Sequence, residues 1–238
     1  RPLNGLIMPS SVRDASPDAW GRRVILNRTY GLKGDNLNGY DLDELTFLLQ
    51  SGSDRIGALD FQASPTRYIA RSAKAVSLDH LITAAERVEK NLPPSPELDQ
   101  ALHHGSSIGG ARPKALIEDG DQRFIAKFSS SSDTYNIVKG GYVAMRLAAL
   151  CGLTAAPVRM VKSSGKDVLL VSRFDRTASG DDWLRHSMVS VLTLLELDEM
   201  QALYATYQDV AETLRLRFSH VTTTLRELFS RLVFNILV

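Results

Sequence analysis

The sequence has almost no cysteine, since Cys151 is the single one among 238 residues. One thiol excludes an internal disulfide framework and suits the reducing conditions of the cytoplasm. Because Cys151 lies in an apolar helical stretch and no partner pattern for a nucleophile surrounds it, we expect an ordinary buried thiol.

The sequence also lacks long apolar runs and an excess of charge of either sign. No run approaches the roughly 18 apolar residues needed to span a membrane, and the N-terminus has no signal-peptide pattern. We therefore expect a cytoplasmic protein with no membrane partner. A net charge of +1 argues against a broad nucleic-acid-binding surface. A content of 44% hydrophobic and 23% charged residues favours a soluble globular protein over a disordered or fibrous one.

Metal-binding chemistry is weakly supported. The five histidines, His80, His103, His104, His186 and His220, show no metal-ligand spacing with cysteine or carboxylate residues. The acidic pair Asp181-Asp182 follows Gly180 and is expected to cap a helix, against which Trp183 packs, rather than to bind a metal. We therefore expect no metal ligand within this sequence.

The first part of the sequence contains helix patterns. The polar, proline-containing start Ser16-Pro17-Asp18 and leucines three and four positions apart are typical of helices. A proline-rich stretch at 93–96 follows and is the best candidate for a domain boundary. The predicted helices cover residues 19–26, a stretch after Asp41 with Leu42, Leu45, Leu48 and Leu49 on one face, and residues 78–91.

After these prolines, turn residues separate short apolar segments. The predicted order is a small-residue loop, a strand, a turn, a lysine-bearing strand, a helix, a strand, a turn, a strand and a connector. This is the order of a protein-kinase small lobe. The segments are loop 105–114, strand 115–117, the turn Asp119-Gly120, strand 123–128, helix 135–151 with its C-cap at Gly152, strand 156–162, turn 163–165, strand 167–171 and connector 172–176.

Such an order suits the handling of ATP. A glycine-rich loop lets backbone N–H groups approach phosphate oxygens, and a lysine on the next strand neutralises their charge. Gly109, Gly110 and Lys127 would fill these roles. Each is a weak signal alone, because a glycine pair usually makes a turn and a lysine at a strand end is usually a solvated edge charge. Their placement in one hairpin, followed by a helix and a second hairpin, favours a nucleotide site.

Six short motifs occur in order along nearly the whole chain. They are Ser16-Pro-Asp-Ala-Trp-Gly-Arg-Arg23, Asp54-Arg-Ile-Gly-Ala-Leu59, Gly109-Gly-Ala-Arg-Pro-Lys114, Phe124-Ile-Ala-Lys127-Phe128, Val143-Ala-Met-Arg-Leu-Ala148 and Ser172-Arg-Phe-Asp-Arg176. In this order they resemble the signatures of the HipA-like serine/threonine kinases, the toxins of bacterial toxin-antitoxin modules. Each motif is weak alone, but the six in sequence are specific.

The resemblance implies an α+β, protein-kinase-like fold of two lobes. Residues 1–96 would form a mostly helical N-terminal segment, and residues 97–176 a small β-rich lobe with the phosphate loop and the connector. Residues 177–238 would begin a helical large lobe. Helices expected at 188–197 and 209–216 would belong to the core of that lobe.

The resemblance also implies transfer of the γ-phosphoryl group of ATP to a serine or threonine of a protein, with Mg²⁺. The best-known relatives modify aminoacyl-tRNA synthetases and arrest translation, and relatives usually bind a small helix-turn-helix antitoxin (HipB-like). ATP and Mg²⁺ are therefore the expected cofactors. The expected partners are such an antitoxin, DNA held through it, and a protein substrate of the translation machinery.

Several residues receive roles through the resemblance. Those of the phosphate loop are Gly109, Gly110, Ala111, Arg112, Pro113 and Lys114; Lys127 contacts the phosphates, and Ser172, Arg173 and Phe174 hold the adenine at the connector. Asp175 reaches the ribose or pins the connector. A purely structural interpretation of the connector is an ion-paired turn with Phe174 in the core.

Ser107 stands where family members carry a serine that the kinase itself phosphorylates, with the adjacent Ser106 as the alternative acceptor. A phosphate there adds roughly −1.5 to −2 charges where the ATP phosphates must bind, so repulsion would inhibit the enzyme. Both serines could also be ordinary loop residues.

The sequence departs from the family pattern at Gly141. The helix after Lys127 normally supplies a glutamate that pairs with this lysine, whereas here Gly140 and Gly141 occupy the matching region. Three interpretations stay open: a weakened kinase, a deliberate substitution, or another acid such as Asp133 in the role. The catalytic aspartate and the magnesium ligands are expected just beyond Val238, so no catalytic residue is assigned within this chain.

Two further function classes remain. One is a catalytically impaired binding module that keeps the fold and acts through an antitoxin and DNA, which Gly141 favours. The other is a small-molecule kinase on a similar fold, which the family resemblance makes the weaker of the two. ATP binding without turnover would support the binding module, whereas self-phosphorylation at Ser107 would exclude it.

Overall fold

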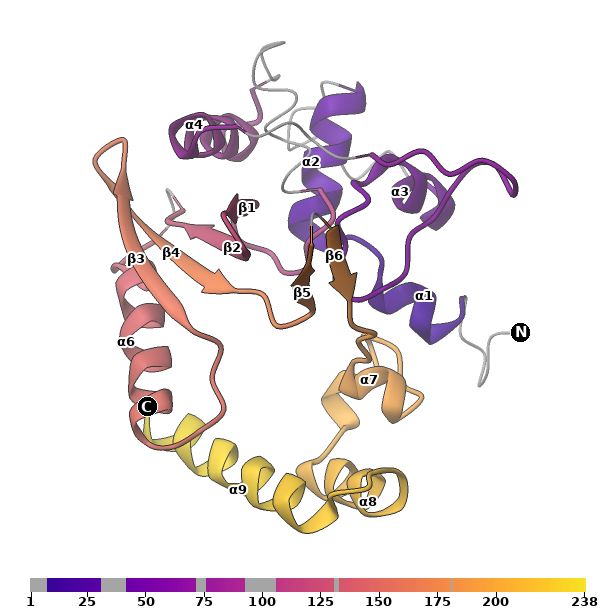
Figure 1. The fold of residues 1–238 in the computed structure, drawn as a ribbon, viewed down its shortest axis with the longest axis vertical. Coiled ribbons are helices and arrows are strands. Elements are labelled where there is room, and N and C mark those ends of the chain that lie inside the picture. The colour runs from indigo at the N-terminus through magenta and orange to yellow at the C-terminus, as the bar shows by residue number, and fades with distance from the viewer. Residues whose placement is uncertain (1–7, 31–41, 72–75, 93–105, 131–132, 181) are drawn as a thin grey trace. The chain divides into compact units, whose positions relative to one another are not determined.

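The computed structural model describes residues 8–30, 42–71, 76–92, 106–130, 133–180 and 182–238. Several predictions fall on positions outside these ranges: the helix start at Asp41, the prolines at 93–96, His103, His104, Gly105 and Asp181. The chain divides into two compact units. Figure 1 colours the elements by their position in the sequence. The sheet unit comprises Ala15–Tyr142 and Ala156–Ser187, and the helical unit comprises Arg1–Asp14, Val143–Ala155 and Met188–Val238.

The sheet unit is built on four antiparallel strands in the order β1-β2-β4-β3. They are β1 (Lys114–Asp119), β2 (Gln122–Phe128), β3 (Val158–Ser163) and β4 (Lys166–Ser172). Each hairpin closes through residues at positive φ, Gly120 in the first and Ser164 and Gly165 in the second, where glycine avoids the steric cost of a Cβ atom. Both predicted hairpins are confirmed.

Helices α2 (Ala19–Tyr30) and α4 (Leu78–Glu89) supply the core on one face of this sheet. Ser77 caps α4 by accepting the N–H of His80. The apolar positions of α4 recur every three to four residues and form one buried stripe. The core contains Trp20 and Val24 of α2, Leu81, Ile82, Ala84, Ala85 and Val88 of α4, and Ala115, Phe124, Ala126, Phe128, Val168 and Leu170 of the sheet.

The first part of helix α6 (Ile137–Leu150) approaches the opposite face of the sheet at Gly141. Val168 and Leu170 of β4 lie on the face of the sheet that packs against α4. Strand side chains alternate between faces, so Leu169 lies on the other face. A Cβ atom on Gly141 would lie 3.3 Å from Leu169 Cδ2. The glycine therefore lets the first part of α6 approach the sheet closely.

The short helix α3 (Glu44–Gln50) begins later than predicted, because Asp43 caps it by accepting the N–H of Thr46, and Leu42 lies before its first turn. Its buried face differs in part from the prediction. Leu48 is buried, but Leu45 is exposed and Phe47 lies in the small cluster with Ile25 and Leu26 of α2. The helix turns Phe47 toward α2 because the larger ring buries more apolar surface.

A third hairpin replaces the helix that was expected after residue 181. Strands β5 (Arg176–Ser179) and β6 (Asp182–Arg185) pair antiparallel around Gly180, whose φ is +61°. Asp182 and Trp183 lie in β6, so the prediction of a capped helix there is wrong. The Trp183 ring lies 4.6 Å below the Arg123 guanidinium group, a cation–π contact from β2 that the local sequence cannot reveal.

The helical unit contains α1 (Ser10–Asp14), the second part of α6, α7 (Val191–Leu194), a 3₁₀ helix at Ala202–Tyr204, α8 (Tyr207–Arg217) and α9 (Val221–Leu237). Asp14 of α1 accepts hydrogen bonds from the N–H and hydroxyl of Ser190, the N-cap of α7. The helix predicted at 188–197 is thus present but short. A capping box of Thr206 and Asp209 starts α8.

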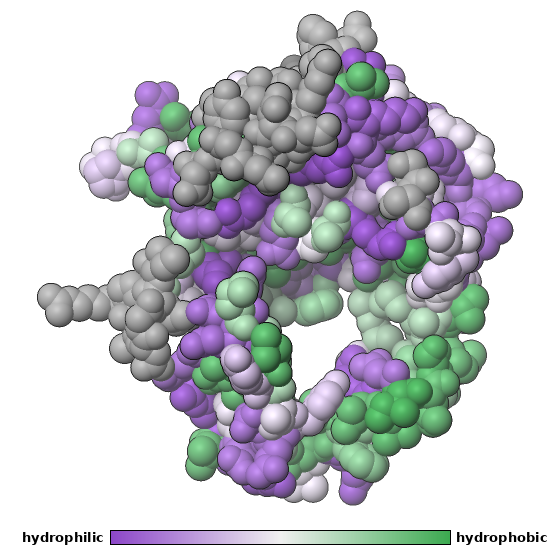
Figure 2. Space-filling view, turned by 180° about the vertical axis from the view of Figure 1, so that it is seen from behind, coloured by the Kyte–Doolittle hydropathy of each residue, from purple (hydrophilic) through white to green (hydrophobic). Residues whose placement is uncertain are grey.

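Apolar side chains remain on the surface of the helical unit, as the space-filling view illustrates (Figure 2). On α9 no residue is buried, and Phe229, Ile236 and Leu237 are all largely exposed. Cys151 is exposed as well, so the expectation of a buried thiol is wrong. It follows the last residue of α6 and precedes Gly152, whose φ of +81° ends the helix as predicted. None of the described helices is long and apolar enough to cross a membrane.

The close approach of α6 to the sheet can be tested with its two adjacent glycines. A Cβ atom on Gly140 would find its nearest neighbour at 4.0 Å, whereas one on Gly141 would press on Leu169. Gly140→Ala should raise the free energy of unfolding by about 0.5–1 kcal/mol through helix propensity. For Gly141→Ala the gain in unfolding free energy should be smaller than for Gly140→Ala by at least about 0.5 kcal/mol, because the added methyl group overpacks the contact. Urea unfolding of both variants measures this, and equal gains would contradict it.

Candidate nucleotide-binding site

The loop that leads into β1 is held by the first turn of α2. Gly110 donates its N–H to Asp18 Oδ2 at 2.6 Å, and Trp20 donates its N–H to the carbonyl of Gly110 at 3.1 Å. The indole Nε1–H of Trp20 donates to the carbonyl of Lys114 at 3.1 Å. A Cβ atom on Gly21 would lie only 2.6 Å from the carbonyl oxygen of Ser106, so α2 touches the loop backbone directly.

A side chain on either glycine of the loop would displace a neighbouring charged group. A Cβ atom on Gly109 would lie 2.7 Å from Asp18 Oδ2, and one on Gly110 would lie 2.8 Å from Lys114 Nζ. Gly110 also has a φ of +96°, which L side chains rarely adopt. The loop is thus a bare backbone that lies directly against a lysine ammonium group.

Lys114 carries a buried charge that no hydrogen bond from a described residue compensates. Its side chain is 7% exposed, and Nζ has no hydrogen-bond partner among the described residues. It pairs in register with Lys127, so two lysines stand opposite each other on neighbouring strands, an arrangement that repels. Burial, with Lys127 adding to it, lowers the pKa of Lys114 to about 8, against a smaller opposing effect of Asp18. An anion bound here would relieve both costs.

Lys127 is exposed on β2, next to Leu169 of β4 in the strand register. Gly141 of α6 backs onto this leucine and offers no carboxylate. Asp133, the acid considered as a substitute, pairs with Arg112 instead and accepts the N–H of Ser130 at 2.9 Å. Arg112 and Ala111 are exposed, while Pro113 is buried and accepts the N–H of Phe128 through its carbonyl.

Ser106 and Ser107 are buried at the start of the loop. Ser106 Oγ accepts the N–H of Gly52 at 3.1 Å, and Ser107 Oγ donates to the carbonyl of Asp54 at 3.1 Å. Phosphorylation of Ser107 would require its hydroxyl to leave Asp54. Its role as an acceptor stays a prediction.

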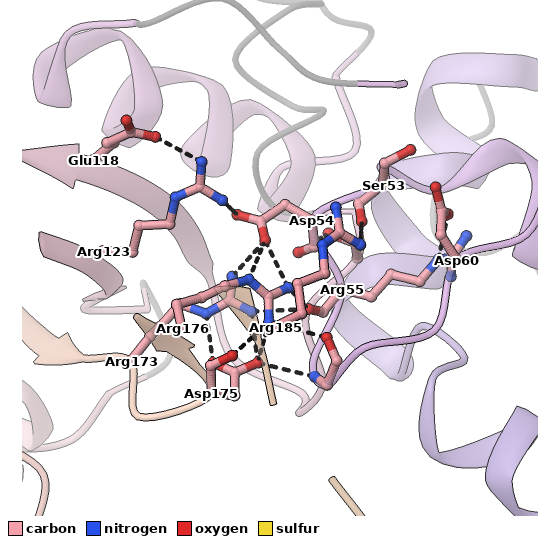
Figure 3. A network of polar contacts seen from close by, with 12 residues as sticks. Ser53, Asp54, Arg55, Asp60, Glu118, Arg123, Arg173, Asp175, Arg176 and Arg185 are labelled. Atoms are coloured by element: carbon pink, nitrogen blue, oxygen red, sulfur yellow. Dashed lines mark hydrogen bonds and ion pairs between the residues drawn. The ribbon is translucent and has the colours of Figure 1, made fainter. Parts of the chain in front are cut away.

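The connector after β4 is fixed by a network of buried and partly buried charges (Figure 3). Arg173 donates from Nε and a terminal nitrogen to the two carboxylate oxygens of Asp175, at 2.9 and 2.8 Å. Asp54 pairs with Arg173 at 3.1 Å, with Arg176 at 2.8 Å and with Arg123 at 3.1 Å. The N–H of Gly57 donates to Asp175 at 2.9 Å.

Charge pairing decides the protonation of this network. Burial alone would raise the pKa of Asp175, but hydrogen bonds and charge from Arg173 outweigh it, and the pKa is lowered. Burial would lower the pKa of Arg173, yet hydrogen bonding with Asp175 and the charge of Asp54 raise it. Asp175 is therefore ionised and held between Arg173 and Arg176, while its role toward a nucleotide stays a prediction.

Phe174 differs from its neighbours, because its side chain is 72% exposed whereas Arg173 and Asp175 are buried. The connector is thus an ion-paired turn, but without Phe174 in the core. Ser172, at the end of β4, is partly buried and donates its N–H to the carbonyl of Pro157.

The structure joins the loop to the connector through one segment that sequence reasoning did not assign to the site. The backbone carbonyl of Asp54 accepts from Ser107, while its carboxylate holds Arg173 and Arg176. Asp18 was equally missed as a neighbour of Gly110. Both residues lie in motifs of the family resemblance, and that position in a motif was the available signal. Among the described residues, no group of three or more His, Cys, Asp or Glu side chains could hold a metal ion.

Comparison with known proteins places this arrangement in a family. The model of the HipA-like C-terminal domain matches residues 106–238, more than half of the chain, and the chain belongs to this family. A solved structure, HipA of Shewanella oneidensis MR-1 in a toxin-antitoxin complex with HipB and operator DNA, has a TM-score of 0.64 and 19% sequence identity. The match covers 96% of this chain and 57% of that HipA chain. No curated protein matches the sequence.

These findings confirm the HipA-like resemblance and a mixed α/β fold with an antiparallel sheet. The assignments of individual residues to ATP, the division at residues 96 and 176, and the two-lobed kinase detail stay predictions.

The buried charge of Lys114 should cost stability. A pKa lowered from 10.5 to about 8 corresponds to roughly 3 kcal/mol, a cost that is present below pH 8 and disappears as the pH rises toward 10.5. Lys114→Met should therefore raise the free energy of unfolding at pH 7 by about 1–3 kcal/mol, and this gain should shrink above pH 8.

The matched control is Lys127→Met, which removes an exposed amine and should change stability by less than about 0.5 kcal/mol. Urea unfolding at pH 7 and pH 9.5 measures both. A destabilised Lys114→Met protein would show that the ammonium group has a partner in solution.

In the connector network, in contrast to Lys114, removing a charge should destabilise the protein. Asp175→Asn leaves Arg173 and Arg176 buried with less negative charge, and should cost about 3–5 kcal/mol of unfolding free energy at pH 7. Since the pKa of Asp175 is lowered on folding, its contribution is present above about pH 4 and is lost as the pH falls further. Asp119→Asn, which breaks the exposed pair with Arg159, is the control and should cost less than about 1 kcal/mol. Similar losses in both variants would refute the distinction.

Proposed function

We propose that the sheet unit binds ATP, and that the protein is a serine/threonine kinase acting as the toxin of a bacterial toxin-antitoxin module. The observation that carries the proposal is Lys114 Nζ, which is buried, has no partner among the described residues and lies against the bare backbone of Gly110. Membership of the HipA-like family supports the kinase and toxin parts.

The phosphate groups fit the loop chemically. A polyphosphate supplies the negative charge that would offset the repulsion between Lys114 and Lys127. The bare backbone at Gly109 and Gly110 lets phosphate oxygens come close, which a side chain would prevent. Lys127 remains exposed, so it is free to reach the same phosphates.

The connector would hold the base of the nucleotide. Phe174 is exposed on a turn whose other side chains are locked into the charge network. Such a ring, fixed at its backbone but open at its face, can pack against adenine. In this proposal Arg173 and Asp175 act by fixing the turn, and Ser172 and Phe174 contact the nucleotide.

The remaining parts of the proposal follow the family. Mg²⁺ would enter bound to the ATP phosphates, since the described part of the chain offers no carboxylate cluster for it. Ser107 would be modified by the kinase itself, and a protein of the translation machinery, such as an aminoacyl-tRNA synthetase, would be the substrate in the cytoplasm. The solved neighbour is a complex with HipB and operator DNA, and we propose a HipB-like antitoxin, with DNA held through it, as partners here.

Calorimetric titration of the chain with ATP in the presence of Mg²⁺ tests the proposal. The chain should bind the nucleotide, and Lys114→Met and Lys127→Met should each weaken binding by about tenfold or more, because each removes a charge-assisted contact. Lys162→Ala on β3 removes another exposed strand lysine and should leave binding unchanged. Absence of binding to the unaltered chain, or equal binding by all variants, would reject the site.

Intact mass of a protein that contains the complete kinase, incubated with Mg²⁺ and ATP, separates binding from phosphoryl transfer. The protein that contains the complete kinase should gain one phosphate, located on Ser107 by peptide mapping and absent from Ser107→Ala. Binding without any phosphate on that longer protein would point to the binding module instead.

A further inference from the structure

We propose that the first turn of α2 is part of the nucleotide site, with Asp18 as the residue that positions the phosphate loop. This inference rests on the proposed ATP site and assigns to it a residue from the N-terminal part of the chain. Asp18 precedes α2 and lies 92 positions before Gly110 in the sequence, yet its Oδ2 atom accepts the Gly110 N–H at 2.6 Å.

The contact is built from both sides. On the loop side, a Cβ atom on Gly109 would lie 2.7 Å from the same Oδ2 atom, so the carboxylate can sit there only because residue 109 is glycine. On the helix side, the N–H of Trp20 donates to the carbonyl of Gly110. The first N–H groups of a helix have no partner within it, so this donor is available for the loop. The two peptide groups that flank the Gly110 Cα atom are therefore both fixed by the same helical turn.

Fixing Gly110 matters because glycine loses more conformational freedom than any other residue when it is ordered. Its φ of +96° is one of many conformations that an unrestrained glycine would sample. A loop held in place before the ligand arrives avoids this entropic cost during binding. Asp18 also fixes the distance between the Gly110 backbone and Lys114 Nζ, the two groups that would meet the phosphate.

Asp18 acts through Gly110, and its own charge would repel a phosphate that came close. Two effects of the carboxylate thus oppose each other, and the hydrogen bond is the larger because it is short and charge-assisted. The charge also favours the protonated form of Lys114, which supports phosphate binding. The expected net effect of Asp18 is tighter nucleotide binding.

Two substitutions separate the hydrogen bond from the charge. Asp18→Asn keeps an oxygen acceptor for the Gly110 N–H and removes the charge, whereas Asp18→Ala removes both. We expect Asp18→Ala to weaken binding of Mg²⁺-ATP by about tenfold, and Asp18→Asn to stay within about threefold of the unaltered chain. This rescue by asparagine is what a positioning role predicts.

Asp43→Ala is the matched control. Asp43 also precedes a helix and accepts a backbone N–H, that of Thr46 at 2.7 Å, but within its own helix α3. Its loss should lower the temperature of thermal unfolding, because a helix cap is removed, and should leave nucleotide binding unchanged. Thermal unfolding of each variant shows whether it is folded before the titration.

The possible outcomes are distinct. If Asp18→Ala and Asp18→Asn both bind more tightly, Asp18 is a competing anion and the positioning role is refuted. Unchanged binding in Asp18→Ala also refutes it while leaving the ATP site intact. If the unaltered chain does not bind ATP, the proposed function fails and this inference fails with it. Should Asp18→Ala not fold, Gly109→Ala tests the same contact by displacing the carboxylate, and binding equal to the unaltered chain would then overturn the proposal.

Discussion

Two aspartates, Asp54 and Asp175, connect parts of the sheet unit that are distant in sequence. The groups they hold are the guanidinium groups of Arg123, Arg173 and Arg176 and the N–H of Gly57. Charges removed from water are tolerated only when each has its partner. The 54–57 segment, strand β2 and the connector therefore keep their positions together, and the loop is tied to them because Ser107 donates to the carbonyl of Asp54.

The buried charge of Lys114 is not paired in the way that the charges of the connector are. In the connector network every carboxylate meets at least two positive or N–H groups, whereas the Lys114 ammonium group has no partner among the described residues. Proteins usually avoid such a group because it costs stability. Local rules are most often broken at functional sites, and a fold that retains this lysine beneath a glycine loop is consistent with an anion as its missing partner.

Local signals in the sequence predicted much of the fold, since turn residues such as Gly120 and Gly165 act on their immediate neighbours and both hairpins were found. Long-range contacts account for what was missed. Trp183 lies in a strand and beneath Arg123, which is 60 positions away, and nothing beside it in the sequence indicates that contact. The same applies to Asp18 and Gly110. The sequence therefore pointed to the glycines of the 106–114 loop, but not to Asp18 and Trp20, which hold the loop in shape.

The exposed thiol of Cys151 makes the chain simple to label. As the single cysteine of the sequence, it offers one position for a maleimide dye or a spin label without any substitution. It follows the C-terminal end of α6, well separated in sequence from the loop and the connector. A probe there would report on that end of the helix while leaving the residues of the proposed nucleotide site chemically unaltered. The same accessibility means that two chains stored without a reducing agent can become joined through this residue.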